Sequence, residues 1–108
     1  MVFNTLIVET KCPQCGSVEL FRIQYSYGFC WTFEYHLGDT LEQTYQQANN
    51  GKEDAERALV LGVSENSCPH CHYDSDGFQD FCILIEKNKL KSVSAWRDFW
   101  EDGYLILD

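Results

Sequence analysis

Two short stretches of the chain hold the residues best suited to chemistry: Cys12-Pro13-Gln14-Cys15-Gly16 and Cys68-Pro69-His70-Cys71-His72. In each stretch two thiols lie two residues apart, a spacing that lets one tight turn direct both sulfurs to the same point. Two such turns supply four soft thiolate ligands, a set that favours a tetrahedral zinc ion. The pattern predicts one structural Zn²⁺ whose ligands are Cys12, Cys15, Cys68 and Cys71. Because protein fills all four positions, such a site leaves no place for a catalytic water.

The second motif has a rival interpretation. Taken alone, Cys68-Pro69-His70-Cys71 is also typical of the active-site tetrapeptide of thiol oxidoreductases. That chemistry requires the first cysteine at a helix N-terminus, where the helix dipole lowers the thiol pKa. The residues that follow are polar and turn-like, and the nearby Asp74 and Asp76 would raise a thiol pKa. A redox enzyme is therefore a remote alternative, marked by turnover of a model disulfide that depends on Cys68.

Composition indicates one globular domain spanning residues 1–108, with 44% hydrophobic and 15% aromatic residues. No run of about 18 apolar residues is present, so a transmembrane helix is not expected. Met1 to Thr10 lacks a basic region and a small-residue cleavage site, so we expect no signal peptide. Paired CxxC motifs without such a signal favour reduced, metal-bound thiols and a cytoplasmic location.

The formal net charge is −9, and phosphate backbones repel a protein this acidic. The charge is typical of a soluble surface, and it also favours attraction towards a basic protein partner. Lys87, Lys89 and Lys91 form the one basic cluster in the sequence. They alternate, so a strand face can present them together if the turn at Asn88 does not separate them.

Alternating apolar residues predict a β-rich chain. We expect strands over Thr5–Lys11, Ala58–Val63, Asp80–Lys87, Leu90–Ser94 and Tyr104–Leu107. The cleanest alternation runs from Val18 to Leu37 and predicts two antiparallel strands that turn near Tyr27-Gly28. Gly62 inside its strand indicates a bulge or a close backbone approach.

Two segments have helical spacing. Asp39 begins a capping-box pattern, and Asn49-Asn50-Gly51 is a plausible helix stop. Near the C-terminus, Ser94 is placed to cap a short helix that ends at Gly103. On that helix Trp96, Phe99 and Trp100 would share one face, either as core or as anchors that bind a partner. Cys30 and Cys82 are expected to face each other across a sheet and to pack as small apolar side chains. A second metal contact or a disulfide is the alternative for this pair.

At the two knuckles the sequence resembles the zinc-ribbon family, in which CPxC knuckles at the ends of β-hairpins jointly hold one structural zinc. The first knuckle matches that pattern fully, whereas the second has His72 where glycine is usual. A histidine adopts a positive φ only at a cost, so either this turn differs or His72 makes a local hydrogen bond. Residues 16–67 separate the two knuckles, which is longer than in compact ribbons. The strand and helix patterns together with this resemblance predict an α+β fold that is mainly β: zinc-ribbon-like antiparallel hairpins with one or two short helices.

Zinc ribbons occur in proteins of many functions, so the resemblance does not select one. A closed metal site, high acidity and no catalytic constellation together predict a non-enzymatic module that binds another protein, and the negative charge favours a basic partner. An immunity, antitoxin or phage-inhibitor type fits this size and charge. The alternative is a nucleic-acid-associated zinc ribbon of the transcription or translation type that uses Lys87, Lys89 and Lys91. Iron can replace zinc in a four-thiolate site when the protein is overproduced.

Overall fold

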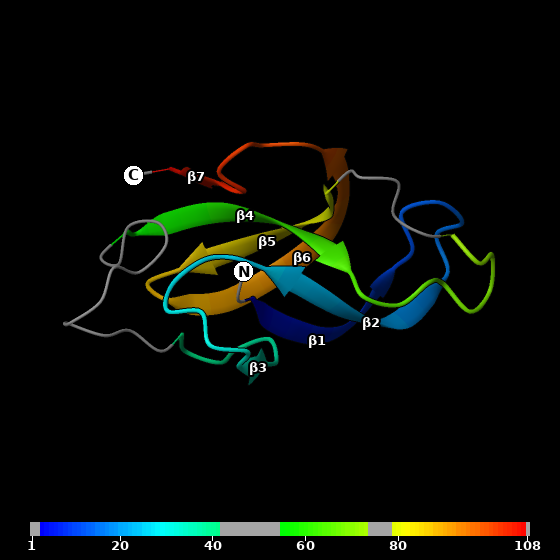
Figure 1. The fold of residues 1–108 in the computed structure, drawn as a ribbon, viewed down its shortest axis with the longest axis horizontal. Helices are drawn as coiled ribbons and strands as arrows, with labels where there is room; N and C mark the ends of the chain where they lie inside the picture. Colours follow the sequence, from blue (N-terminus) through cyan, green and yellow to red (C-terminus); the bar gives the residue numbers. More distant parts are fainter. Residues whose placement is uncertain (1–2, 42–54, 74–78, 108) are drawn as a thin grey trace.

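The structure is a computed structural model that describes residues 3–41, 55–73 and 79–107. Within these ranges the chain forms β-strands and no helix (Figure 1). The strands are β1 (Asn4–Lys11), β2 (Val18–Tyr25), β3 (Glu34–Tyr35), β4 (Arg57–Ser64), β5 (Gln79–Glu86), β6 (Lys89–Asp98) and β7 (Tyr104–Ile106). Their order is β3-β1-β2-β4-β5-β6, and β7 pairs with β4. All pairings are antiparallel except that of β1 with β3, so the sheet is mixed.

The prediction of an α+β fold is wrong, because the described residues are all-β. The helix expected after Ser94 is the continuation of β6, which stays paired with β5 as far as Asp98. The spacing of the residues alone does not distinguish a helix from a strand. The edge of β5 favours a strand, because pairing with it satisfies the backbone N–H and C=O groups of β6. Part of the helix expected after Asp39 falls on residues 42–54, which lie outside the described residues. Its start is not helical, since Leu41 N–H donates to Asn88 O at 2.7 Å.

The first half of the Val18–Leu37 alternation forms β2, with Phe21, Ile23 and Tyr25 all buried. The second half does not return as its antiparallel partner. Only Glu34–Tyr35 is strand, and it pairs in parallel with β1 on the side away from β2. Thr32 has a φ of +58°, which breaks the extended backbone that a strand needs.

Asn4 holds the irregular segment between β2 and β3 in place. Its side-chain Nδ2 donates to Phe29 O at 3.0 Å, and its Oδ1 accepts from Trp31 N and Phe33 N, each at 3.1 Å. The Asn4 side chain is fully buried, so these three bonds replace the ladder that a neighbouring strand would supply.

One edge of β4 is shared by two strands. Ala58 to Val60 pair with β7, whereas Val63 and Ser64 pair with β2. Gly62 lies between these stretches, where a Cβ atom would come within 2.5 Å of Ile23 Cγ2. The sequence prediction of a close backbone approach at Gly62 is therefore confirmed.

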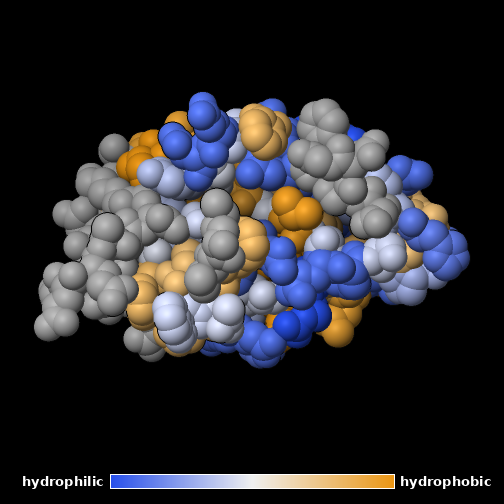
Figure 2. Space-filling view, viewed as in Figure 1, coloured by the Kyte–Doolittle hydropathy of each residue, from blue (hydrophilic) through white to orange (hydrophobic). Residues whose placement is uncertain are grey.

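The core lies on the concave side of the curved sheet. β6, at one end of the strand order, returns close to β1, which lies next to the other end, so the sheet curves around this core (Figure 1). Buried core side chains come from six strands and include Leu6, Phe21, Ile23, Tyr25, Tyr35, Val60, Phe81, Ile83, Ile85 and Leu90. On the surface in view, hydrophobic residues form separate patches among hydrophilic ones (Figure 2). In the part of the chain described, no helix is long and apolar enough to cross a membrane.

Candidate metal centre

The structure brings together the four cysteines predicted as ligands. The loop after β1 and the loop after β4 lie side by side at one end of the molecule (Figure 1). The sulfurs of Cys12, Cys15, Cys68 and Cys71 all lie within 4.8 Å of one another. Cys12 Sγ is 3.7 Å from Cys71 Sγ, and Cys15 Sγ is 3.8 Å from Cys68 Sγ. A tetrahedral ion with metal–sulfur bonds of about 2.3 Å requires sulfurs about 3.8 Å apart, so the site can bind a metal ion.

The two knuckles are built in the same way. In the first, Gly16 N–H donates to Cys12 O at 3.0 Å, and Cys12 N–H donates to Ser17 O at 2.8 Å. This pair of bonds closes a tight turn that directs both thiols to one side. In this turn the residue that follows the second cysteine has a left-handed backbone conformation. That residue is Gly16, and its φ is +77°.

The second knuckle repeats the pattern with different residues. His72 N–H donates to Cys68 O at 2.8 Å, and Cys68 N–H donates to Tyr73 O at 3.1 Å. His72 has a φ of +59°, so it occupies the position that Gly16 occupies in the first knuckle. The turn is therefore the same, and the histidine adopts a backbone conformation that costs an L-residue about 1–2 kcal/mol.

Strand pairing delivers the two knuckles to the same place. β1 and β2 pair over their full length, from Asn4–Tyr25 to Lys11–Val18, so the first knuckle is the turn region of a regular hairpin. The second knuckle follows β4, which pairs with β2 only at Ile23 and Gln24. Beyond that point the strand ladder between β2 and β4 ends.

Asn66 continues the contact where the strand ladder ends. Its Oδ1 accepts from Arg22 N at 2.9 Å, and its Nδ2 donates to Leu20 O at 3.1 Å. One side-chain amide thus binds a backbone N–H and a backbone C=O of β2, as a paired strand residue would. Ser64 Oγ donates to Asn66 O at 2.6 Å and fixes the turn. These contacts carry the chain along β2 to Cys68, and neither residue was singled out from the sequence.

The surroundings of the cysteines set their ionisation. Hydrogen bonds from the hydroxyl and the backbone of Ser17 lower the pKa of Cys15 to about 6. Burial opposes ionisation of Cys68, but hydrogen bonds from the backbone N–H groups of Cys71 and His70 outweigh it and lower its pKa. Burial raises the pKa of Cys71 to about 12. Metal binding releases the thiol protons and leaves four adjacent thiolates. The positive charge of a bound cation would offset the repulsion between these thiolates.

Ser17 is a further member of the site that sequence reasoning missed. Its Oγ is 3.2 Å from Cys15 Sγ and 4.0 Å from Cys68 Sγ, so one hydroxyl contacts a sulfur of each knuckle. Its Oγ also lies 3.3 Å from Glu19 Oε1, which is an alternative acceptor for the single hydroxyl proton. The sequence signal was present, since a serine directly after the knuckle glycine is a short polar side chain beside two thiolates.

A buried carboxylate on β5 hydrogen-bonds to the residue that closes the second knuckle. Asp80 on β5 is only 1% exposed and accepts a hydrogen bond from Tyr73 Oη at 2.9 Å. Arg97 on β6 lies 3.6 Å from the same carboxylate oxygen and also hydrogen-bonds to Tyr73 Oη. Tyr73 is the residue whose carbonyl closes the knuckle, so these contacts link the knuckle to the β5–β6 pair.

Other residues predicted from the sequence are dispersed. Lys87 and Asn88 form the β5–β6 turn with φ values of +50° and +64°, so the turn separates Lys87 from Lys89 and Lys91. Lys87 Nζ lies 4.0 Å from Glu56 Oε2, and all three lysines are exposed.

The predicted aromatic anchors do not share a helical face. Trp96 lies on β6, and Phe99 and Trp100 lie in the connection that follows. Trp96 is 50% exposed and Phe99 is 61% exposed, whereas Trp100 is half-buried. The two remaining thiols are not on facing strands. Cys30 lies in the segment that follows β2, whereas Cys82 lies on β5, whose partners among the described strands are β4 and β6.

No protein-family model, no curated protein and no solved structure matches the chain.

Proposed function

We propose that this chain is a non-enzymatic β domain that binds another protein and is held together by one structural zinc ion. Two observations support zinc. The four sulfurs have tetrahedral spacing, and among the described residues the cluster contains no harder nitrogen or oxygen ligand. Supporting a structural use is the closed ligand set, which leaves no coordination position for a substrate. On this proposal the site belongs to the zinc-ribbon type.

The zinc ion would contribute to stability in proportion to its binding energy. Structural zinc binds small domains with apparent free energies of about 10–16 kcal/mol, comparable to the whole stability of a domain of this size. The knuckles join the β1–β2 hairpin to the end of β4, where only two residues of β4 pair with β2. Removing the metal should therefore separate these parts, and the fold should be lost with it.

The observation that carries protein binding is the exposure of large apolar side chains beside one another in sequence. Trp96 and Phe99 are half exposed or more, although a tryptophan and a phenylalanine gain most from burial. Aromatic side chains of this kind dominate the energetics of protein interfaces. With a net charge of −9, the partner favoured by electrostatics is basic, as an inhibitor or antitoxin-type protein would require.

The metal is tested by native mass spectrometry with elemental analysis. We expect one zinc per chain, lost together with the fold on chelation. Cys68→Ser should abolish zinc retention, whereas the matched variant Cys30→Ser should keep one zinc per chain. A folded, metal-free protein whose Cys68 and Cys71 cycle between dithiol and disulfide would overturn the zinc proposal.

Protein binding is tested by recovery of partners from the native host. Phe99→Ser should weaken capture of a specific partner by at least tenfold, as expected when an interface anchor worth about 1.4 kcal/mol or more is lost. Leu20→Ser is the control, because Leu20 is 56% exposed but lies on β2 rather than on β6 or the connection that follows it. Equal loss in both variants, or salt-sensitive recovery of nucleic acid alone, would contradict the proposal.

A further inference from the structure

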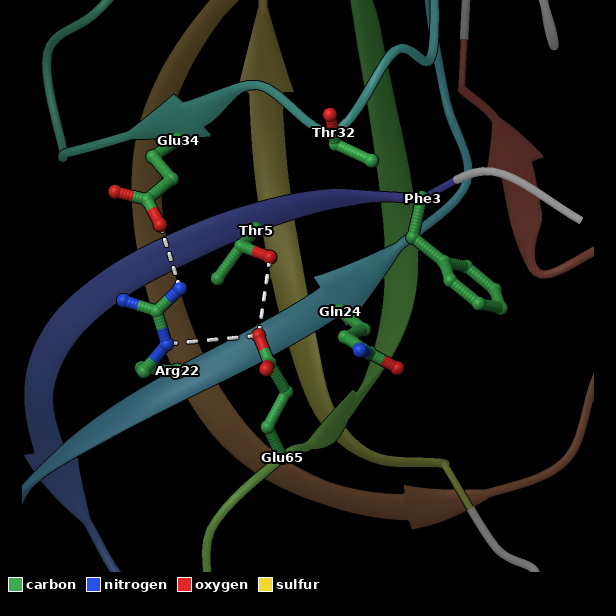
Figure 3. A pocket seen from close by; sticks show the side chains of 7 residues that line it. All are labelled: Phe3, Thr5, Arg22, Gln24, Thr32, Glu34 and Glu65. Atoms are coloured by element: carbon green, nitrogen blue, oxygen red, sulfur yellow. Dashed lines mark hydrogen bonds and ion pairs between the residues drawn. The ribbon is translucent and has the colours of Figure 1, made fainter.

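Two adjoining hollows open on the outer face of the sheet. The first, shown in Figure 3, has a volume of about 300 Å³ and lies over β1, β2 and the approach to β3. The second, of about 340 Å³, lies where β2 diverges from β4 and the 101–103 turn comes alongside. Phe3 and Gln24 line both, so the hollows form one groove across the strands. We call it the cross-strand groove.

The first hollow has an ordered set of charges. Arg22 lies between two carboxylates (Figure 3), with its Nη2 2.6 Å from Glu34 Oε2 and its Nε 3.6 Å from Glu65 Oε2. Thr5 Oγ1 also donates to Glu65 Oε2 at 3.1 Å. The guanidinium lowers the pKa of Glu34 through its hydrogen bond, so that carboxylate stays ionised. One arginine and two carboxylates leave one negative charge in this hollow.

The second hollow is apolar with an acidic rim. Leu61 and Val63 of β4 contribute apolar walls, and Glu101 and Asp102 stand at the rim. Its described lining contains no lysine or arginine, so these carboxylates are not balanced within the hollow. The whole groove therefore holds four carboxylates against one guanidinium, an excess of three negative charges.

This combination matches the side chain of a lysine or arginine. Such side chains lay their aliphatic stems on apolar surface while the cationic head stays at a polar rim. Each hollow is at the lower end of the size range of small-molecule sites and suits a single side chain better than a cofactor. A groove that crosses the strands admits an extended chain with basic side chains at both hollows.

We propose that the cross-strand groove binds an extended basic segment of a partner protein. One basic side chain enters the second hollow over Val63 and pairs with Glu101 and Asp102, and a neighbouring one reaches Glu65. The proposal rests on the proposed function in taking the ligand to be a protein. It adds the site and the chemistry of the segment. Phe99 precedes the acidic rim by two residues, so the groove adjoins the exposed aromatic side chains in sequence.

The contacts of Glu65 connect the groove to the metal centre. Glu65 N–H donates to Arg22 O at 2.7 Å, and Glu65 lies just before Asn66 and the second knuckle. Its carboxylate is thus placed by the same chain segment that delivers Cys68. The groove should be complete only when the second knuckle is docked on β2.

The test uses a labelled hexapeptide of alternating lysine and alanine, titrated into the zinc-loaded full chain at low salt. Backbone amide shifts in NMR spectra should change at the groove residues Gln24, Val63 and Gly103. The double variant Glu101→Gln, Asp102→Asn should weaken binding about fivefold, the sum of two partly exposed ion pairs. A matched double variant with the same change in net charge, Glu9→Gln with Glu56→Gln, should change it less than twofold, because both residues are exposed and outside the groove.

Equal weakening by the two double variants would show general charge attraction and overturn the groove. Amide shifts spread over the whole acidic surface would do the same, as would equal binding of an alternating glutamate–alanine peptide. The outcome is separable from that of the proposed function. If the groove variant retains the natural partner while Phe99→Ser loses it, the groove proposal fails and protein binding stands. If neither variant affects any protein partner, the proposed function itself fails.

Discussion

Replacing His72 by glycine should stabilise this protein, although it removes an entire side chain. His72 is exposed and has a φ of +59°, and its backbone N–H closes the second knuckle. The left-handed conformation costs an L-residue about 1–2 kcal/mol relative to glycine. Glycine loses about 0.5–1 kcal/mol more backbone entropy on folding, so the expected net gain is about 0.5–1 kcal/mol.

The first knuckle supplies the reciprocal experiment. A Cβ atom added at Gly16 would meet no heavy atom within 4 Å, so Gly16→Ala introduces no steric clash. The alanine must adopt the left-handed conformation that glycine adopts more easily. We therefore expect the free energy of unfolding to fall by about 0.5–1 kcal/mol. Because the two positions are equivalent in the two turns, the two variants should shift stability by similar amounts in opposite directions.

Urea unfolding at a fixed excess of free zinc measures both changes. A difference of this size should move the midpoint by about half a molar unit with an unchanged slope. A lower midpoint for His72→Gly would refute the reasoning, because the imidazole would then contribute an interaction that exceeds the backbone strain. An unchanged midpoint for Gly16→Ala would show that the turn does not require a left-handed residue.

Three further predictions concern the sheet that carries the knuckles. Gly62→Ala should destabilise by about 3 kcal/mol in thermal unfolding, since the new Cβ would lie 2.5 Å from Ile23 Cγ2 and 3.0 Å from the carbonyl oxygen of Gln24; an unchanged melting temperature would contradict the close approach. Asn4→Ala should cost about 2–4 kcal/mol and loosen the segment before β3, measurable as faster amide exchange there, because it leaves buried backbone groups without partners; protection like that of the wild type would count against this. Burial raises the pKa of Tyr25, and among the described residues no group hydrogen-bonds to its Oη. Tyr25→Phe should therefore be neutral or stabilising at pH 7, and its advantage should grow above pH 10, where the unfolded tyrosine ionises and the folded one does not; a clear loss at pH 7 would reveal a partner for the hydroxyl.

The chemistry of the metal centre was readable from the sequence because it is local. Each knuckle is a five-residue turn whose two thiols are positioned by bonds within the turn itself, such as Gly16 N–H to Cys12 O. Strands with clear alternation were equally readable, as with Phe21, Ile23 and Tyr25 on β2, because a sheet with one buried face imposes that period. Gly62 signalled a close approach for the same local reason, the lack of a side chain.

Tertiary structure alone decided the parts that depend on long-range partners. Trp96, Phe99 and Trp100 have helical spacing, but the edge of β5 was available to pair with β6, and sheet pairing prevailed over that spacing. Likewise, the aromatic residues after Gly28 alternate like a strand, yet the buried side chain of Asn4 holds them as an irregular segment. Asn66 binds β2 across 46 residues of sequence, and no local pattern marks such a contact. The sequence therefore determined which residues can bind the metal, and the pairing of distant strands determined how those residues meet.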